Sequence, residues 1–248
     1  MTKGLDCATP LSAAKAAAFR ADGYEFACRY LVPSGWKRLT REEAEAISEA
    51  GLHIVSVFET TADRALGGRA AGLADGAAAA RTAQAIGQPE GSAIYFAVDF
   101  DASATQMAAV IDYIRAASEA TPAYATGVYG SYAVIEAVRR AGVCSRYWQT
   151  YAWSRGRKAD GIHLYQYRND IDVNGVGIDM NESYGNEGWW NTMGYPLKAE
   201  DANEIIARFL SHEFNLASDE DKRRRNELAN ELRKASGQAV QPYAPNGG

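Results

Sequence analysis

Two aspartates one residue apart follow a strongly apolar stretch near the middle of the chain. Residues 93–98 form a continuous apolar run of strand length, and Asp99 and Asp101 come directly after it, on either side of Phe100. A run this apolar is typical of a strand that is buried on both faces of a parallel sheet. Because side chains alternate along a strand, we expect Asp99 and Asp101 to point the same way and to form a catalytic pair of carboxylates.

The segments around this run alternate between strand-like and helix-like patterns. We expect eight strands, over residues 4–8, 24–30, 52–58, 93–98, 123–129, 145–151, 161–167 and 176–180, with helix-length connections between the first five. One of those helices starts at a capping-box pattern formed by Thr40 and Glu43. The alternation predicts a parallel sheet of the α/β class, and eight units predict closure into a TIM-type (β/α)8 barrel.

The pattern changes after Trp190. Two amphipathic helical stripes follow and predict a C-terminal helical hairpin. Its apolar surface is too small for it to be stable alone, so we expect it to pack on the barrel or on a partner. The last residues are rich in proline and glycine and are expected to be disordered. The predicted organisation is a barrel over residues 1–192, a helical hairpin over 196–237 and a disordered tail over 238–248.

Four of the expected strands end in acidic residues. These are Asp6 on the first strand, Glu59 on the third, Asp99 with Asp101 on the fourth, and Asp179 on the eighth. In a parallel barrel, catalytic groups come from the carboxyl ends of several strands. Strands one and eight become neighbours when a barrel closes, so Asp6 and Asp179 should lie side by side. A single acid at a strand end is more often a helix cap or an ion-pair partner, but acids at four strand ends together favour a site.

Aromatic residues accompany the acids at the ends of the fifth and sixth strands. They are Tyr129, Trp148, Tyr151 and Trp153. Carboxylates between aromatic walls suit a carbohydrate, because the apolar faces of sugar rings stack on aromatic side chains. Glycoside hydrolysis needs one protonated and one ionised carboxyl group, and crowding of several acids separates their pKa values in this way. The alternative for each aromatic residue is a packing role in the barrel.

Composition argues against several other classes of function. The chain of 248 residues has a net charge of −5, which argues against a general nucleic-acid binder, and no apolar run approaches membrane length. The three cysteines and three histidines lack metal-type or catalytic spacing, so we expect no metal, no cofactor and no thiol chemistry. Residues 170–182 resemble a calcium-binding EF-hand loop, but Asn181 occupies the twelfth position and no helices flank it. We interpret them as a polar loop between strands seven and eight.

Six short motifs occur in a specific order between residues 3 and 190. They are Gly4–Asp6, Phe58–Glu59, Tyr95–Asp101, Thr126–Gly130, Tyr165–Tyr167 and Gly177–Asn181. This order resembles the lysozyme-type glycoside hydrolases of family 25. The resemblance is closer to a relative of that family, the glycoside-hydrolase-like domain first catalogued as domain of unknown function 1906.

The resemblance implies a modified (β/α) barrel that cleaves the glycan strand of peptidoglycan at N-acetylmuramic acid. Asp99 would be the central carboxylate, while Asp6 and Asp179 would hold the charge and geometry of the pocket. Asp101 stands where the lysozyme family has its general-acid glutamate, so either Asp101 or Glu59 would donate the proton. The sugar contacts would come from the four aromatic residues at the strand ends, together with Tyr95 and Gln166 of the matched motifs.

The resemblance also implies a partner and a place of action. The partner would be the peptidoglycan glycan strand, with no nucleic acid and no membrane insertion. The hairpin resembles tails in phage lysins and in proteins of spore-forming bacteria, which implies a wall-binding or docking element. The amino terminus shows no leader, so we expect synthesis in the cytoplasm and action at the cell wall, as a lysin released through a pore or as a spore protein. Two rival hypotheses are a barrel that binds wall glycan without cleaving it and a structural component of a spore or virion.

Overall fold

The chain forms two units, residues 1–192 and 193–248. The computed structural model describes residues 1–193, 199–212, 214–236 and 238–243. The first unit is a closed barrel in which the strands follow one another in chain order. Its strands are β1 (Thr2–Asp6), β2 (Phe26–Tyr30), β3 (His53–Phe58), β4 (Ala93–Ala97), β5 (Ala125–Gly130), β6 (Arg146–Thr150), β7 (Leu164–Val173) and β8 (Val176–Ser183). The predicted eight-stranded α/β barrel is confirmed.

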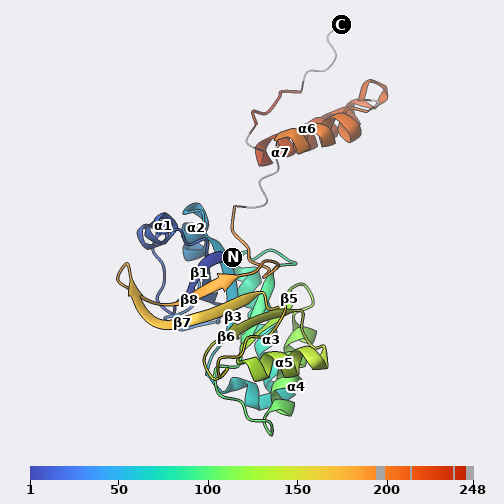
Figure 1. Ribbon diagram of the computed structural model, residues 1–248. Coiled ribbons are helices and arrows are strands. Elements are labelled where there is room, and N and C mark those ends of the chain that lie inside the picture. The colour runs from blue at the N-terminus through green and yellow to red at the C-terminus, as the bar shows by residue number, and fades with distance from the viewer. Residues whose placement is uncertain (194–198, 213, 237, 244–248) are drawn as a thin grey trace. The chain divides into compact units, whose positions relative to one another are not determined.

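Helices lie outside the ring of strands (Figure 1). They are α1 (Ala13–Ala21), α2 (Arg41–Glu49), α3 (Gly68–Ile86), α4 (Met107–Ala120) and α5 (Tyr132–Ala141), with a short 3-10 helix (Arg64–Gly67) before α3. Among the residues that the structure describes, no helix is long and apolar enough to cross a membrane.

The expectation of an all-parallel sheet is wrong for one strand. β1 to β7 pair in parallel, whereas β8 is antiparallel to both β7 and β1. The reason is that residues 170–173, part of the stretch interpreted above as a polar loop, continue β7, and only Asn174 and Gly175 separate β7 from β8. A two-residue connection reverses the chain, while a parallel return needs a crossover of a dozen residues or more. The resulting β7–β8 hairpin reaches away from the ring (Figure 1).

The second unit is helical. α6 (Ala199–Ile205) continues as a π-helical turn (Ile206–Leu210), and a 3-10 turn (Phe214–Leu216) precedes α7 (Asp219–Ala235). Helices occur where the sequence predicts the two arms of a hairpin. Residues 238–243 contain no helix or strand, and the rest of the tail that we expect to be disordered, residues 244–248, lies outside the described residues.

The barrel unit has two apolar cores, one inside the ring and one between the strands and the helices. In β4, Ala93, Tyr95 and Ala97 belong to the inner core, while Ile94 and Phe96 belong to the outer core. The prediction that this run is buried on both faces is thus confirmed. The same alternation in β1, β3 and β5 directs every second residue inward, which is how the strands aim their last side chains at one place.

Two glycines leave room for the large rings of the inner core. A Cβ atom on Gly4 would lie 2.2 Å from the ring of Phe26, and one on Gly127 would lie 2.4 Å from the ring of Tyr95. Both distances are far inside van der Waals contact. The barrel interior is filled by pairing a residue without a side chain with an aromatic residue on the neighbouring strand.

A buried ion pair fastens the first strands to α2. The guanidinium of Arg29 on β2 donates to the carboxylate of Glu43 at 2.7 Å and to the carbonyl of Cys7. The Glu43 carboxylate also accepts the backbone N–H of Leu11 at 2.8 Å. The capping-box prediction is therefore half right: Thr40 Oγ1 accepts the Glu43 N–H at 3.2 Å, but the glutamate side chain turns inward to Arg29 instead of back to the cap.

We expect Glu43→Gln to lower the free energy of unfolding by about 3–5 kcal/mol, because it leaves the fully buried Arg29 charge uncompensated. The measurement is urea-induced unfolding followed by circular dichroism. Glu119→Gln is the matched control, since Glu119 pairs with Arg69 at 2.7 Å on the solvent-exposed surface, where water screens the pair and the effect is small. Equal destabilisation by the two variants would contradict a structural role for the buried pair.

Candidate active site

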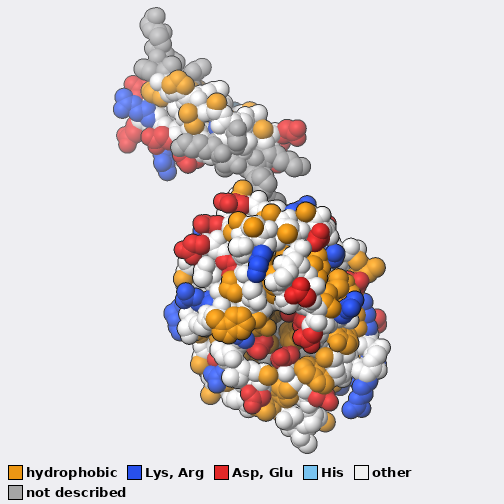
Figure 2. Space-filling model, turned by 90° about the vertical axis from the view of Figure 1, so that its left-hand side faces the viewer, with side chains coloured by type: hydrophobic (Ala, Val, Ile, Leu, Met, Phe, Trp, Pro, Cys, Tyr) orange, Lys and Arg blue, Asp and Glu red, His pale blue; other side chains and the backbone are white. Residues whose placement is uncertain are grey.

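A small cavity opens at the carboxyl ends of the parallel strands. Its volume is about 110 Å³, and four carboxylates from four strand regions line it: Asp6, Glu59, Asp99 and Asp179. In the space-filling view, acidic side chains gather around a hollow in the face of the barrel unit (Figure 2). The remaining lining residues are Tyr30, Val57, Tyr129, Trp148, Gln166 and Asn169.

Gln166 on β7 connects the two acids at the closure of the barrel. Its Nε2 donates to Asp6 Oδ2 at 2.9 Å and to Asp179 Oδ2 at 3.1 Å. Its Oε1 accepts the hydroxyls of Tyr129 at 2.9 Å and Thr150 at 2.8 Å. All the hydrogen-bonding capacity of this buried amide is used inside the protein. The Gln166 amide therefore holds the Asp6 and Asp179 carboxylates in position, and its contact with substrate stays a prediction.

Asp6 and Asp179 are paired by register, as the sequence predicts for neighbouring first and eighth strands. Their Cα atoms are partners in the antiparallel β1–β8 ladder. Asn181 Nδ2 adds a hydrogen bond of 2.6 Å to Asp6, and the backbone N–H of Asp170 donates to Asp179 at 2.9 Å. Because β8 is antiparallel, Asp179 lies within the strand and not at its carboxyl end, yet it reaches the same rim.

Glu59 and Asp99 follow the ends of β3 and β4 and continue the inward side-chain series of those strands. Lys37, from the β2–α2 loop, places its Nζ 3.5 Å from Glu59 Oε1 and 4.0 Å from the centre of the Tyr30 ring. The exposed fraction of the side chain is 15% for Glu59 and 21% for Lys37. Lys37 thus brings a positive charge to two residues of the cavity lining, and this charge is paired with the Glu59 carboxylate.

Burial raises the pKa of all four cavity acids. It raises the pKa of Asp6 to about 7, with repulsion from Asp179 as the next cause and the hydrogen bonds from Gln166 and Asn181 opposing it. Burial also raises the pKa of Asp179. For Glu59 the Lys37 charge opposes the increase, and for Asp99 the Tyr129 hydroxyl and Lys37 oppose it. A protonated carboxyl group beside an ionised one is therefore accessible near neutral pH.

The structure does not bring Asp101 into the cavity. β4 ends at Ala97, and the Ala102 N–H donates to the Phe100 carbonyl at 2.9 Å, which turns the chain away from the strand direction. The side-chain alternation on which the predicted Asp99–Asp101 pair relies reaches Asp99 and stops at this turn. Asp101 is consequently exposed to solvent, while Asp99 remains in the cavity lining.

Three of the predicted aromatic contacts are buried in the barrel. Tyr129 and Trp148 line the cavity from β5 and β6, and Trp148 donates its Nε1 hydrogen to Asn181 Oδ1 at 2.8 Å. Tyr95 lies below them in the inner core with no exposed surface, and its hydroxyl donates to the Glu187 carbonyl at 2.8 Å. Tyr95 lies two inward-facing positions before Asp99, so it is inside the barrel and below the cavity, where a ligand does not reach it.

The other two, Tyr151 and Trp153, lie outside the cavity on the loop after β6 and are exposed. Trp153 has a φ of 55°, in the left-handed region that is strained for a bulky residue. Buried Ser154 holds this conformation, because its hydroxyl donates to the Thr150 carbonyl at 2.6 Å and accepts the Tyr132 N–H at 2.9 Å. The loop thus presents an aromatic face to solvent on a rigid support.

Sequence reasoning missed four residues of the site: Tyr30, Lys37, Asn169 and Asn181. Tyr30 is at the end of β2 and could have been found by the rule that identified Tyr129. Lys37 is on a loop, where no periodic pattern gives its direction. Asn181 lies in a matched motif, but its hydrogen bonds to Trp148 and Asp6 depend on the reversed β8.

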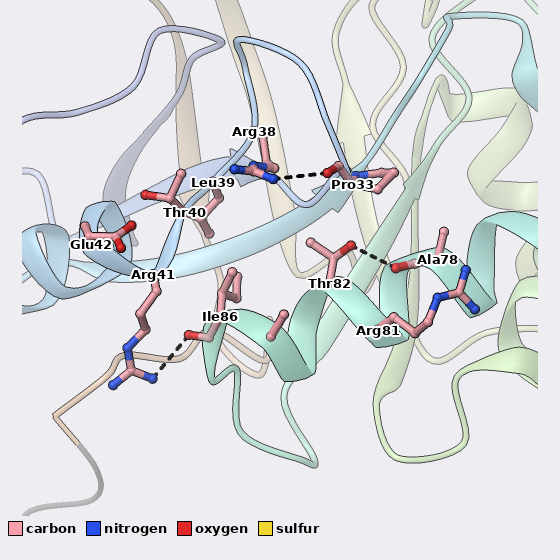
Figure 3. Close-up of a pocket in the computed structure, with 11 residues that line it drawn as sticks. Pro33, Arg38, Leu39, Thr40, Arg41, Glu42, Ala78, Arg81, Thr82 and Ile86 are labelled. Carbon is pink, nitrogen blue, oxygen red and sulfur yellow. Dashed lines mark hydrogen bonds between the residues drawn. The ribbon is translucent and has the colours of Figure 1, made fainter.

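A larger hollow of about 460 Å³ lies on the outside of the barrel, between the start of α2 and the end of α3 (Figure 3). Arg38, Arg41 and Arg81 line it with one acid, Glu42, and none of the predicted site residues. Arg38 and Arg41 are engaged with the carbonyls of Pro33 and Ile86 at 3.2 and 3.3 Å. We assign the chemistry to the smaller cavity, because the carboxylates are there. Within the described ranges, no group of three or more His, Cys, Asp and Glu residues is arranged to hold a metal ion.

Comparison with known proteins matches the barrel unit. A family model described as "Rv2525c-like, glycoside hydrolase-like domain" matches residues 17–185. The uncharacterized protein YbfG of Bacillus subtilis (strain 168) is 32% identical over 143 residues, which are 50% of this chain and 20% of YbfG. The match therefore spans about a fifth of the length of that curated relative.

Two solved structures share the fold. The Tat-secreted protein Rv2525c of Mycobacterium tuberculosis, in complex with L-tartrate, superposes with a TM-score of 0.69 at 28% identity, over 76% of this chain and 98% of that one. The catalytic domain of endolysin ply40, from bacteriophage P40 of Listeria monocytogenes, gives a TM-score of 0.52 at 12% identity, over 75% and 95% of the two chains. The predicted glycoside-hydrolase-like domain is confirmed: the chain belongs to the Rv2525c-like family of glycoside hydrolase-like domains.

Proposed function

We propose that the barrel is a glycosidase that cleaves the glycan strand of peptidoglycan, of the N-acetylmuramidase type. The observation that carries the proposal is the convergence of four carboxylates in one cavity, each with its pKa raised by burial. Glycoside hydrolysis requires one carboxyl group to be protonated and a second to be ionised across the scissile bond. The glycoside hydrolase-like family supports the same reaction class.

In this proposal the four acids divide into two pairs. Glu59 is the general acid, because it is a partly buried carboxyl group in the cavity lining and burial raises its pKa. Asp99 stabilises the positive charge that develops at the anomeric carbon or positions the acetamido group of the substrate. Asp6 and Asp179, held by Gln166, fix the geometry of the floor.

The size of the cavity limits what it holds. A volume of 110 Å³ corresponds to about four water molecules, so it takes the reacting end of one sugar and not a whole disaccharide. The rest of the glycan would then lie along the rim, on exposed aromatic faces such as those of Tyr151 and Trp153. We propose action at the cell wall, with the helices of residues 196–237 as a wall-binding or docking element.

One observation favours a second candidate function, a barrel that binds wall glycan without cleaving it. The Lys37 ammonium beside Glu59 favours the ionised carboxylate, which has no proton to donate. The position of the lysozyme-family general acid is occupied by Asp101, which is exposed. A non-cleaving barrel would sediment with purified peptidoglycan and release no reducing ends.

We expect Glu59→Gln and Asp99→Asn each to slow the release of reducing ends from purified peptidoglycan by a factor of about 10²–10⁴, the usual contribution of a positioned acid or base. Thermal unfolding of each variant checks that the fold is intact. Asp101→Asn should stay near the wild-type rate, since its carboxyl group lies outside the cavity. Full activity of Glu59→Gln together with loss in Asp101→Asn would move the general acid to Asp101.

Asp6→Asn should make the protein more stable near neutral pH. Below about pH 4 both folded and unfolded chains carry a protonated Asp6, so its ionisation contributes nothing. Between that pH and about 7 the unfolded chain loses the proton while the folded chain keeps it, so wild-type stability falls through this window. The variant lacks this loss and should gain up to about 4 kcal/mol over wild type at pH 8. Denaturant midpoints at pH 4 and pH 8 give the comparison, and an equal difference at both would refute it.

A further inference from the structure

The β2–α2 loop brings the Lys37 ammonium group to a cavity whose charged lining residues are acids. No lysine or arginine occurs in the cavity lining, but Lys37 contacts two of the lining residues, Glu59 and Tyr30. Its Nζ lies at 3.5 Å from Glu59, at the long limit of a hydrogen bond. An ammonium group has three donors, so two remain for a ligand after the contact with Glu59.

The backbone beneath Lys37 is fixed by the buried ion pair of the barrel. Arg29 Nη2 donates to the Lys37 carbonyl at 3.3 Å, and the Arg29 guanidinium is itself bound to Glu43 at 2.7 Å. The next residue but one, Leu39, donates its N–H to the Tyr30 carbonyl at 2.9 Å. The root of the lysine is therefore rigid, while its flexible side chain lies over the Tyr30 ring and can exchange one carboxylate partner for another.

We propose that Lys37 binds a carboxylate of the substrate and so selects glycans whose sugars carry an acid group over neutral glycans. This rests on the proposed function at the same cavity. Four carboxylates would repel an anionic ligand, and Lys37 is the group at the cavity edge that can offset this repulsion. An acidic 2-acetamido sugar meets the requirement, because its carboxylate can pair with Lys37 while its ring end enters the cavity.

Binding of this kind would also prepare Glu59 for catalysis. The groups that face Glu59 are Lys37 from the loop, Tyr30 from β2 and Asp99 after β4. Once a substrate carboxylate shares the Lys37 charge, burial and Asp99 are left to favour the protonated form of Glu59. An acidic sugar would then favour the protonated Glu59 that its own cleavage requires, and a neutral sugar would not.

The test compares an N-acetylglucosaminyl–N-acetylmuramic acid tetrasaccharide with its dimethyl ester, in which both carboxylates are replaced by uncharged esters that are one methyl group larger. Binding to the full chain is measured by titration calorimetry. Wild type should bind the acid at least tenfold more tightly than the ester. Lys37→Met should lose this preference or bind the ester more tightly, because the cavity carboxylates then repel the acid unopposed. Lys37→Arg should keep the preference, because it keeps the charge.

Arg38→Met is the control from the same loop. Arg38 is directed to the Pro33 carbonyl in the outer hollow, so its loss should leave the preference for the acid unchanged (Figure 3). A wild type that does not distinguish the two ligands, or a Lys37→Met variant that still prefers the acid, would overturn the proposal. Absence of binding to either ligand would overturn it as well.

Cleavage assays on the same ligands separate this proposal from the proposed function. Preferential binding of the acid without any cleavage would contradict the proposed glycosidase activity and would support Lys37 as the residue that selects acidic glycans. Cleavage of acid and ester at equal rates would support the glycosidase and remove Lys37 from selection. If both proposals hold, kcat for the acid should exceed kcat for the ester in wild type, and the difference should vanish in Lys37→Met.

Discussion

The site depends on one buried amide placed between two carboxylates. Gln166 uses both N–H groups on Asp6 and Asp179 and its oxygen on the hydroxyls of Tyr129 and Thr150. Two ionised carboxylates that accept hydrogen bonds from the same nitrogen repel each other, and burial strengthens the repulsion because little water screens it. The amide gives each carboxylate a donor and holds them in one geometry. It therefore joins β1, β5, β6, β7 and β8 where the barrel closes.

The buried carboxylates of the site lower the stability of the folded chain. An Asp6 carboxyl group with a pKa of about 7 is destabilising when it ionises, since the unfolded chain would ionise it more easily. A core of neutral residues at the closure would avoid the loss. Crowded buried acids with shifted pKa values are typical of functional sites. The loss of stability that they cause is therefore an argument that they serve a function and not the fold.

Much of the fold follows from local patterns, and part of the site does too. The two-sided burial of residues 93–98 and the inward series that ends in Asp99 come from alternation alone. Alternation fails at Asp101, because a strand ends where its hydrogen bonds end and the sequence does not mark that residue. It also fails for β8, whose direction is decided by a two-residue turn at Asn174. Lys37 was out of reach, because a loop has no period to give the direction of its side chains.

The reversal of β8 explains why the four acids are not equivalent. Asp179 lies inside a strand, fixed by ladder pairing, by Gln166 and by the N–H of Asp170, which has a φ of 56° at an irregularity in β7. Glu59 and Asp99 instead follow strand ends, and the partner of Glu59 is a lysine on a long, flexible stem. In the proposed glycosidase, the rigid pair would hold a sugar in place, and the pair with an exchangeable partner would change its protonation when the sugar arrives. The division of roles that we propose for the carboxylates thus follows from the direction of one strand.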